Sequence, residues 1–513
     1  MNTNETIMTD LIRSARELRE RFIADPYRPA YHITAPEGVC GPFDPNGALF
    51  WKGRYHLMYI VQTDKGHCWA HISSKDLIHW RHHPLALEPG EGDTGIFSGG
   101  ASLDKNGTPT ITYWGLGAPR GICIATSTDD LLEVWTKSPH NPVIGETQPG
   151  LAEVELDDKK LVYGAADPSA IWIHDGRYYM ITGNLLVLRE FGLKREQSEH
   201  QGDTVYLFVS DDLAKWEYLH PFYTSNRQWT RADEDNMCPD FFPLPSNPDG
   251  GSVSDRHMLL FISHNLGCQY YIGTYSGDRF EPETHGRMTW VDNAFFAPES
   301  LVDDRGRRIM WAWIFDGRSN ETRQVSGWSG TMSLPRVLWL NEDKTLRMAP
   351  AEELKILRCN PREITDMVVP ADIHLPLENV SGNCLELEIE FAPGQAKQFG
   401  VKICCSAGGE EETAVFYDAV DKALKIDTRY ASLGEGPKTV ESAPLELADD
   451  ELLKLRIFVD RSVVEVFAND RQAAMRRIYP TRDDALGVLL FAKGGSMTIP
   501  SLRAWDMAET NPW

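Results

Sequence analysis

The chain has 513 residues, and 51 Lys and Arg against 75 Asp and Glu give it a formal net charge of −24 at pH 7. A surplus of carboxylates repels the phosphates of nucleic acids and the surfaces of anionic membranes, so neither is an expected partner. The length suits two or three domains, and the 10% of aromatic residues with 41 Gly and 31 Pro is typical of a turn-rich β protein.

Residues 1–27 are predicted to form an amphipathic helix that ends before Asp25-Pro26 and packs on the main domain. Apolar residues recur there at helical spacing, at Met8, Leu11, Ile12, Ala15, Leu18 and Phe22. This stretch contains no apolar run long enough for a secretory signal or a membrane span. The nine cysteines are scattered, odd in number and without a C-x-x-C pair, which indicates reduced thiols. The expected compartment is therefore the cytoplasm.

Residues 28–347 are predicted to form an antiparallel all-β domain, because short β-type runs alternate with turns and no long helices connect them. One phrase recurs in this region, as SSKDLIHW (73–80), STDDLLEVW (127–135) and SDDLAKW (210–216), with a weaker echo in YSGDRFEP (275–282). A Ser/Asp/Leu turn that closes on a Trp indicates a radially repeated four-stranded sheet, as in a β-propeller.

Residues 348–364 are predicted to be a linker with a short helix, and residues 365–513 a β-sandwich. The sandwich is indicated by runs that alternate apolar and polar residues: CLELEIEFA, LKLRIFVDRSVVEVFA and LGVLLFA. Asp460 and Glu465 alternate with apolar residues along one of these runs, which is typical of a structural hairpin.

Three acidic turns precede aromatic-rich β runs in the predicted propeller. Asp44 lies in DPNG, Asp167 lies in ADPSA, and Glu234 and Asp235 lie in the cluster RADEDNMCPDFF. Turns at equivalent ends of successive sheets would converge on the propeller axis. Retaining glycoside hydrolysis requires two carboxyl groups about 5–5.5 Å apart, so these turns indicate a candidate active site.

At this point the chain resembles family 32 of the glycoside hydrolases, the invertase, inulinase and levanase group. The resemblance rests on the order of eight motifs: RPAYHIT, DPNG, HISSKDLIHW, GIFSGGA, ADPSA, CPDFF, GWSGTMSLPR and FVDRSVVEVF. It implies an all-β fold, a five-bladed β-propeller with the active site in its funnel followed by a C-terminal β-sandwich. It also implies retaining cleavage of a terminal β-fructofuranosyl unit from sucrose or a short fructo-oligosaccharide.

The resemblance also implies residue roles. Asp44 matches the family nucleophile, and Asp167 matches the carboxylate that binds fructose hydroxyls and stabilises the transition state. The expected substrate-binding residues are Asn46, Gln62, Trp69, Phe97, Ser98, Glu299 and Trp313. No metal or cofactor is expected, and the expected partner is a small neutral sugar.

Three positions depart from the family pattern. Phe43 replaces an Asn, Ala166 replaces an Arg, and Met237 replaces the Glu that is the family's general acid/base. A Met cannot carry a proton. Either the acid has moved to a neighbouring carboxylate, or the site only binds a fructoside. We favour relocation to Glu234, with Asp235 in reserve, because a longer side chain reaches further and a carboxylate neighbour raises a Glu pKa.

The sequence leaves several alternatives open. A fructosyltransferase or a difructose-forming or difructose-cleaving enzyme would share the first half-reaction, and a homodimer through the sandwich is an option. His79, His82 and His83 lack the helical spacing of a zinc site, and His264 is interpreted as part of a capped turn rather than as a substrate contact.

Overall fold

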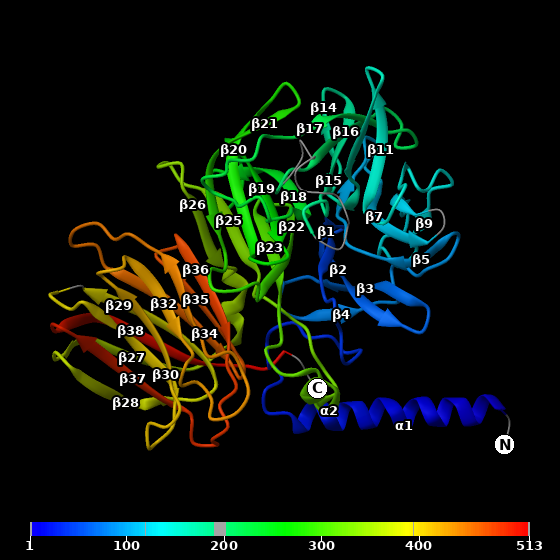
Figure 1. Ribbon diagram of the computed structural model, residues 1–513. Helices are drawn as coiled ribbons and strands as arrows, with labels where there is room; N and C mark the ends of the chain where they lie inside the picture. The colour runs from blue at the N-terminus through cyan, green and yellow to red at the C-terminus, as the bar shows by residue number, and fades with distance from the viewer. Residues whose placement is uncertain (1–2, 118–119, 189–201, 393, 511–513) are drawn as a thin grey trace. The chain divides into compact units, whose positions relative to one another are not determined.

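The computed structural model describes residues 3–117, 120–188, 202–392 and 394–510 (Figure 1). The chain divides into two compact units. Unit 1 comprises Met1–Gly41, Ile314–Leu334 and Glu352–Trp513, and unit 2 comprises Pro42–Trp313 and Pro335–Ala351. A search of the described ranges finds no helix with the length and apolarity needed to cross a bilayer.

Unit 2 begins with three antiparallel sheets. The first has the order β1-β2-β3-β4, with strands Pro45–Trp51, Arg54–Thr63, Gly66–Ser74 and Trp80–His82. The second has the path β10-β8-β7-β5, to which β6 and β9 add, with β5 Asp93–Ile96, β6 Ala101–Leu103, β7 Pro109–Gly117, β8 Gly121–Thr126, β9 Thr136–Lys137 and β10 Ile144–Gly145. A hairpin follows, formed by β11 (Leu151–Leu156) and β12 (Lys159–Gly164).

Three more sheets continue the same arrangement. One has the path β13-β15-β16-β17 with β14 added, formed by Ala166–Pro168, Trp172–His174 (β14), Arg177–Gly183, Tyr206–Ser210 and Glu217–Pro221. The next has the order β18-β19-β20-β21, with strands Met237–Pro245, Val253–Ser263, Gly267–Ser276 and Arg279–Arg287. The last has the path β22-β23-β25-β26, with strands Phe295–Val302, Arg308–Ile314, Arg336–Leu340 and Leu346–Pro350.

The innermost parts of these sheets contact one another in a closed cycle. Strand β1 contacts β6, β7 contacts β13, β13 contacts β18, β18 contacts β22, and β22 contacts β1 again. Sheets repeated around a closed ring are the defining feature of a β-propeller, in which no sheet leaves its inner strand unpacked. The predicted propeller is thus confirmed, whereas the number of blades, five, stays a prediction.

The recurrent phrase of the sequence forms the same turn three times, after β3, β8 and β16. Its leucine has a positive φ in each case, 64° at Leu77, 56° at Leu132 and 65° at Leu213. The indole N–H of the tryptophan that closes the phrase donates to the carbonyl of that leucine, at 3.1, 2.9 and 3.2 Å. The phrase is therefore the turn that leads from the third strand of a sheet to its outer strand.

Three inner strands, β13, β18 and β22, have near their start a residue of positive φ followed by a proline. The φ angles are 32° at Asp167, 49° at Cys238 and 45° at Ala297. Strand register shifts at the first two of these places, between residues 166 and 168 and between 237 and 240. Proline cannot donate to a strand ladder, and positive φ costs about 1–3 kcal/mol at a non-glycine residue. The tertiary structure therefore has to hold these strand starts in place.

Unit 1 contains the helices and the sandwich. Its smaller elements are α1 (Thr3–Ala24), α2 (Asn320–Ser326), β24 (Thr331–Met332) and the 3₁₀ helix η3 (Glu352–Leu357). One sandwich sheet has the order β27-β38-β29-β34-β35-β36, with strands Arg358–Val369, Met497–Met507, Cys384–Ala392, Leu453–Asp460, Val463–Ala468 and Gln472–Arg477. The other has the order β28-β37-β30-β31-β32-β33, with strands Ile373–Ser381, Gly487–Lys493, Gln398–Cys405, Thr413–Asp418, Ala423–Asp427 and Val440–Pro444.

The N-terminal helix is present as α1, and its apolar stripe is covered only in part. Met8, Leu11 and Ile12 are more than half exposed, whereas Phe22 in the last turn is buried. The stripe is covered only near the C-terminal end of the helix.

Asp460 and Glu465 are structural, as the sequence indicates. The carboxylate of Asp460 accepts hydrogen bonds from the backbone N–H groups of Ala30, Tyr31 and His32 at 2.6–2.9 Å. The ring of His32 lies between Asp460, at 2.8 Å, and Glu465, at 3.1 Å, and all three side chains are buried. These contacts attach residues 30–32 to the sandwich within unit 1.

Strands β2 and β3 bury a row of histidines in unit 2. His56 Nδ1 lies 2.9 Å from His71 Nε2, and the His71 ring stacks on His83 at 4.3 Å. Burial lowers the pKa of His56 to about 4 and that of His71 well below its ordinary value. These rings are therefore neutral in the folded protein at pH 7. Within the described ranges, no three His, Cys, Asp or Glu side chains are arranged to hold a metal ion.

A pH-dependent stability follows from this row. The unfolded chain binds a proton at His56 below about pH 6.5 and the folded chain only below about 4, so the free energy of unfolding falls as the pH falls between these values. We expect a loss of about 2 kcal/mol between about pH 7.5 and about pH 5, measured by urea unfolding. His56→Gln should make this pH dependence shallower, whereas the exposed His140→Gln should not. An unchanged pH dependence in His56→Gln would contradict the prediction.

Candidate active site

Unit 2 contains a cavity of about 340 Å³ at one end of its inner strands. This volume lies in the range of small-molecule sites. The residues that line it come from the starts of the inner strands and from the ends of the strands that return beside them: Pro42, Asp44, Phe97, Ser98, Trp114, Asp167, Leu185, Leu188, Met237, Cys238, Ile262, His264, Phe296 and Trp313. Antiparallel pairing places these two sets of strand ends at the same edge, so residues far apart in the sequence meet there.

Two buried carboxylates, Asp44 and Asp167, lie in this cavity. Their side chains flank the same thiol, because Cys238 Sγ lies 3.5 Å from Asp167 Oδ2 and 4.0 Å from Asp44 Oδ2. The hydroxyl of Ser98 donates to Asp44 Oδ2 at 2.7 Å. The Oδ1 atoms of both aspartates are buried and have no hydrogen-bond partner among the described residues. Buried acceptors without a donor are what hydroxyl groups of a ligand would satisfy.

The environment shifts both carboxyl groups toward neutral pH. Burial raises the pKa of Asp44 to about 6, against the lowering effects of the Ser98 hydrogen bond and of His264. Burial and then the charge of Asp44 raise the pKa of Asp167 to about 7. Neighbouring acids whose pKa values are raised by burial, and in one case by the charge of the other, are typical of a catalytic site.

His264 also faces the cavity and is paired with Asp235. Its Nδ1 lies 2.6 Å from Asp235 Oδ2, and its backbone N–H donates to Asp235 Oδ1 at 2.8 Å. Asp235 is fully buried, whereas the His264 side chain is 44% exposed. Burial lowers the pKa of His264, but the hydrogen bond and charge of Asp235 and the charges of Asp167 and Asp44 outweigh it and raise the pKa.

Glu234 lies outside the cavity and is fully engaged. Arg287 Nη2 lies 3.0 and 2.9 Å from its two carboxylate oxygens, and Gln269 Nε2 donates to Oε2 at 3.0 Å. The backbone N–H of Arg231 donates to Oε1 at 2.9 Å. Both carboxylate oxygens are taken by these donors, and the side chain does not line the cavity, so this placement does not support a role for Glu234 as proton donor.

The other predicted site residues divide into two groups. Phe97, Ser98 and Trp313 line the cavity, whereas Asn46, Gln62, Trp69 and Glu299 do not. Asn46 donates to Asp44 O and accepts from Gly99 N, and Glu299 accepts from Ala48 N at 2.9 Å. Trp69 is buried, with its indole N–H donated to Phe97 O, and Gln62 is exposed. Asn46, Trp69 and Glu299 thus hold the backbone that carries the cavity.

Apolar side chains occupy the positions that depart from the family pattern. Phe43 is fully buried with its ring 4.9 Å from that of Tyr59, and Ala166 is fully buried. Met237 is 3% exposed and lines the cavity. The cavity wall also includes Trp114 and Phe296, which sequence reasoning missed. The sequence shows that Trp114 and Phe296 lie in β runs, but it does not show that these parts of β7 and β22 lie at the cavity.

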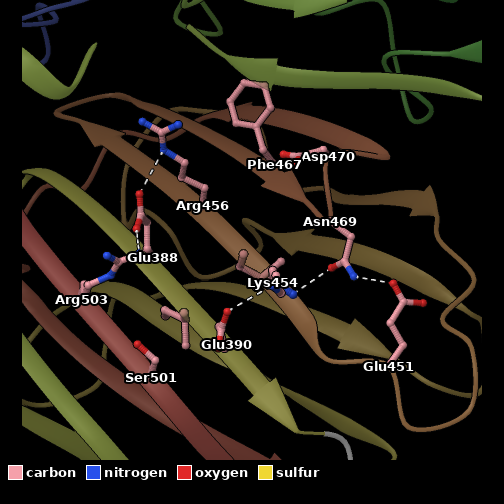
Figure 2. Close-up of a pocket in the computed structure, with 12 residues that line it drawn as sticks. Glu388, Glu390, Glu451, Lys454, Arg456, Phe467, Asn469, Asp470, Ser501 and Arg503 are labelled. Atoms are coloured by element: carbon pink, nitrogen blue, oxygen red, sulfur yellow. Dashed lines mark hydrogen bonds and ion pairs between the residues drawn. The ribbon is translucent and has the colours of Figure 1, made fainter. Parts of the chain in front are cut away.

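A second cavity, of about 480 Å³, lies on the sandwich and serves as a contrast (Figure 2). Its charged side chains have partners. Lys454 Nζ lies 3.3 Å from Glu390 Oε1, and Arg503 Nη2 lies 2.5 Å from Glu388 Oε2 (Figure 2). The Asn469 side-chain amide donates to Glu451 Oε1 at 2.8 Å. Groups that neutralise one another leave no unpaired acid or base for chemistry, which favours the unit 2 cavity as the active site.

Comparisons with known proteins agree with this site. Residues 32–350 match the model of the glycosyl hydrolases family 32 N-terminal domain, and residues 353–506 match that of the family 32 C-terminal domain. The chain is 28% identical to a sucrose-6-phosphate hydrolase of Zymomonas mobilis over 96% of this chain and 94% of that protein. It is also 28% identical to a levanase of Bacillus subtilis over 97% of this chain and 73% of that protein.

The fold has counterparts among solved structures. The crystal structure of fructan 1-exohydrolase IIa from Cichorium intybus matches with a TM-score of 0.81 and 24% identity, covering 94% of this chain and 98% of that one. The predicted resemblance and the predicted all-β fold are confirmed by these matches.

The ion pair of Glu234 predicts a large effect on stability. Arg287→Met would leave a buried carboxylate without its cation, so we expect the free energy of unfolding to fall by about 3 kcal/mol, the lower end of what such a loss costs. Arg279→Met, at the exposed start of the same strand β21, is the matched control and should change stability little. Equal stability of the two variants in urea unfolding would contradict a structural role for Glu234.

Proposed function

Because the chain belongs to family 32 of the glycosyl hydrolases, we propose that it releases terminal β-fructofuranosyl units from sucrose or short fructo-oligosaccharides with retention of configuration. The single observation that supports this function most directly is the pair of buried carboxylates, Asp44 and Asp167, whose Oδ1 atoms have no partner among the described residues and line one cavity. Aromatic walls with a few polar groups suit a polyhydroxylated, neutral ligand.

In the proposed mechanism, Asp44 is the nucleophile. Its carboxylate attacks the anomeric carbon of the fructosyl unit and forms a covalent ester, which water then hydrolyses. The Ser98 hydroxyl bonded to Oδ2 orients the carboxylate and leaves Oδ1 for the attack. Asp167 accepts hydrogen bonds from sugar hydroxyls, and these strengthen as positive charge develops on the ring in the transition state.

The substrate class follows from the relatives. Those named above are a sucrose-6-phosphate hydrolase and a levanase, so hydrolysis is favoured over fructosyl transfer for this chain. We include sucrose 6-phosphate among the fructosides to be assayed. Binding of a fructoside without turnover is the remaining alternative, and the rates below separate it from hydrolysis.

The compartment and assembly belong to the same proposal. All nine cysteines are free, which is consistent with the cytoplasm. A homodimer through the β-sandwich remains a proposal that sedimentation of the full chain tests directly.

Loss of the nucleophile should abolish activity. We expect Asp44→Asn to lower kcat/KM for sucrose and for an activated aryl β-fructofuranoside by about a thousandfold or more, because both substrates need the covalent step. Asp175→Asn, on the exposed hairpin between β14 and β15, is the matched control and should retain activity. Wild-type rates in Asp44→Asn would refute the proposed function, and a wild-type protein that binds but never cleaves a fructoside would support a binding protein instead.

The pH dependence should show an acidic limb. Asp44 must be ionised to attack, and its pKa is raised to about 6 by burial, so kcat/KM should fall as the pH decreases through about 6. Initial rates with the aryl fructoside test this limb without a contribution from leaving-group protonation. Full activity at about pH 4, where an aspartate of ordinary pKa is still half ionised, would contradict it.

A further inference from the structure

Among the described residues that line the cavity there is a nucleophile, but no carboxyl group is left to protonate the leaving group. Asp44 and Asp167 carry the roles proposed above, and Glu234 is bound to Arg287 outside the cavity. Met237 lines the cavity and has no proton to donate. An alkoxide is a poor leaving group, so cleavage of sucrose requires an acid within hydrogen-bond reach of the glycosidic oxygen. The need for such an acid rests on the proposed function.

Strand register identifies one candidate. Met237 pairs with Ile262 across strands β18 and β19. Strand β19 ends at Ser263, and His264 is the first residue of the turn that follows it. Met237, Ile262 and His264 all line the cavity. His264 is therefore a titratable side chain of the cavity wall at the same end of the β18/β19 pair as Met237.

The hydrogen bonds of His264 fix which nitrogen is available. Nδ1 is bonded to Asp235, and the backbone N–H of His264 is bonded to the same carboxylate, so ring and backbone are both oriented. Asp235 is itself held in place, because its carbonyl accepts from Ser263 Oγ at 2.7 Å. Among the described residues Nε2 makes no hydrogen bond. A buried aspartate that orients Nδ1 and stabilises the imidazolium leaves Nε2 as the site of proton transfer.

We propose that His264 is the general acid and base of this hydrolase and that Asp235 is its positioning residue. In the first step Asp44 forms a bond to the anomeric carbon, the glycosidic C–O bond breaks, and the departing oxygen keeps that electron pair and takes the proton from His264 Nε2. In the second step neutral Nε2 accepts a proton from water, the water oxygen bonds to the anomeric carbon, and the Asp44 carboxylate departs. His264 then carries its proton again.

The charges around His264 suit this role. The groups that face its ring are carboxylates: Asp235 before β18, Asp167 in β13 and Asp44 before β1. Cys238, in the same cavity, has its pKa raised well above the ordinary value by burial and by the two aspartates, so it stays a neutral thiol. Two further described neighbours carry no titratable group: Phe296 contacts the ring, and Asn293 donates to the His264 carbonyl. The imidazolium is therefore stabilised near neutral pH.

The test compares two leaving groups in full-length variants. His264→Gln should lower kcat/KM for sucrose by about 10²–10⁴-fold, the usual contribution of a general acid, but should lower the formation of the covalent ester from a 4-nitrophenyl fructoside by less than about tenfold. Release of 4-nitrophenol in the first turnover measures that step alone, because nitrophenolate departs without a proton. His140→Gln is the matched exposed control, and thermal unfolding checks that each variant is folded.

The pH profile separates a proton donor from a merely structural residue. Wild-type kcat/KM for sucrose should fall at alkaline pH as His264 loses its proton, and this limb should be absent with the nitrophenyl substrate. Asp235→Asn removes the anion that raises the pKa of His264, so the alkaline limb should move to lower pH. An unmoved limb in Asp235→Asn would overturn the pairing.

The outcomes distinguish this inference from the proposed function. If His264→Gln cleaves sucrose at the wild-type rate, the role of His264 is overturned and the hydrolase function stands. The same holds if the variant loses activity equally toward sucrose and the nitrophenyl fructoside. A loss confined to sucrose 6-phosphate would assign His264 to recognition of the phosphate and likewise overturn it. A wild-type protein that cleaves neither fructoside overturns the proposed function and the inference together.

Discussion

Burial of two carboxylates beside each other is the constraint on which the rest of unit 2 depends. Asp44 and Asp167 have little contact with water, and their raised pKa values show that the protein does not fully offset this burial. Such a pair persists only in a rigid frame. The frame is the closed ring of inner strands, and the bonds of Asn46 to Gly99 and of Glu299 to Ala48 join its neighbouring members.

Antiparallel pairing explains how His264 reaches the cavity. Strand β18 begins at the cavity, and β19, which returns beside it, ends there. A residue just after β19 therefore shares the cavity with one at the start of β18, and His264 takes its place near Met237. The carboxylate that raises the pKa of this histidine is Asp235, which lies two residues before strand β18. The acidic turn thus contributes to the site by orienting His264 through Asp235, and not by placing a carboxylate in the cavity.

Prolines at the strand starts connect the local sequence with the site. The motifs DPNG, ADPSA and CPDFF each place a proline where the ladder begins, and the residue before it has a positive φ at Asp167 and Cys238. Because proline cannot donate to the ladder, the strand is interrupted there, and the preceding side chain can face the cavity instead of a neighbouring strand. The backbone strain at Asp167 and Cys238 is local, and the surrounding ring of sheets keeps both residues in this conformation.

The sequence by itself determined the β architecture, since the period of apolar residues, the repeated turn and the terminal alternation are local patterns. It also determined that Asp44 and Asp167 stand at strand starts. Only the tertiary structure decided the pairing of the acidic turn, because Glu234 and Asp235 are adjacent in sequence but point to different partners, Arg287 and His264. Whether Glu234 or Asp235 forms the ion pair with Arg287 depends on the strand register across β18 to β21. Contacts between sheets assigned Trp69 and Glu299 to the frame, through their hydrogen bonds to Phe97 and Ala48, and the end of β19 placed His264 in the cavity.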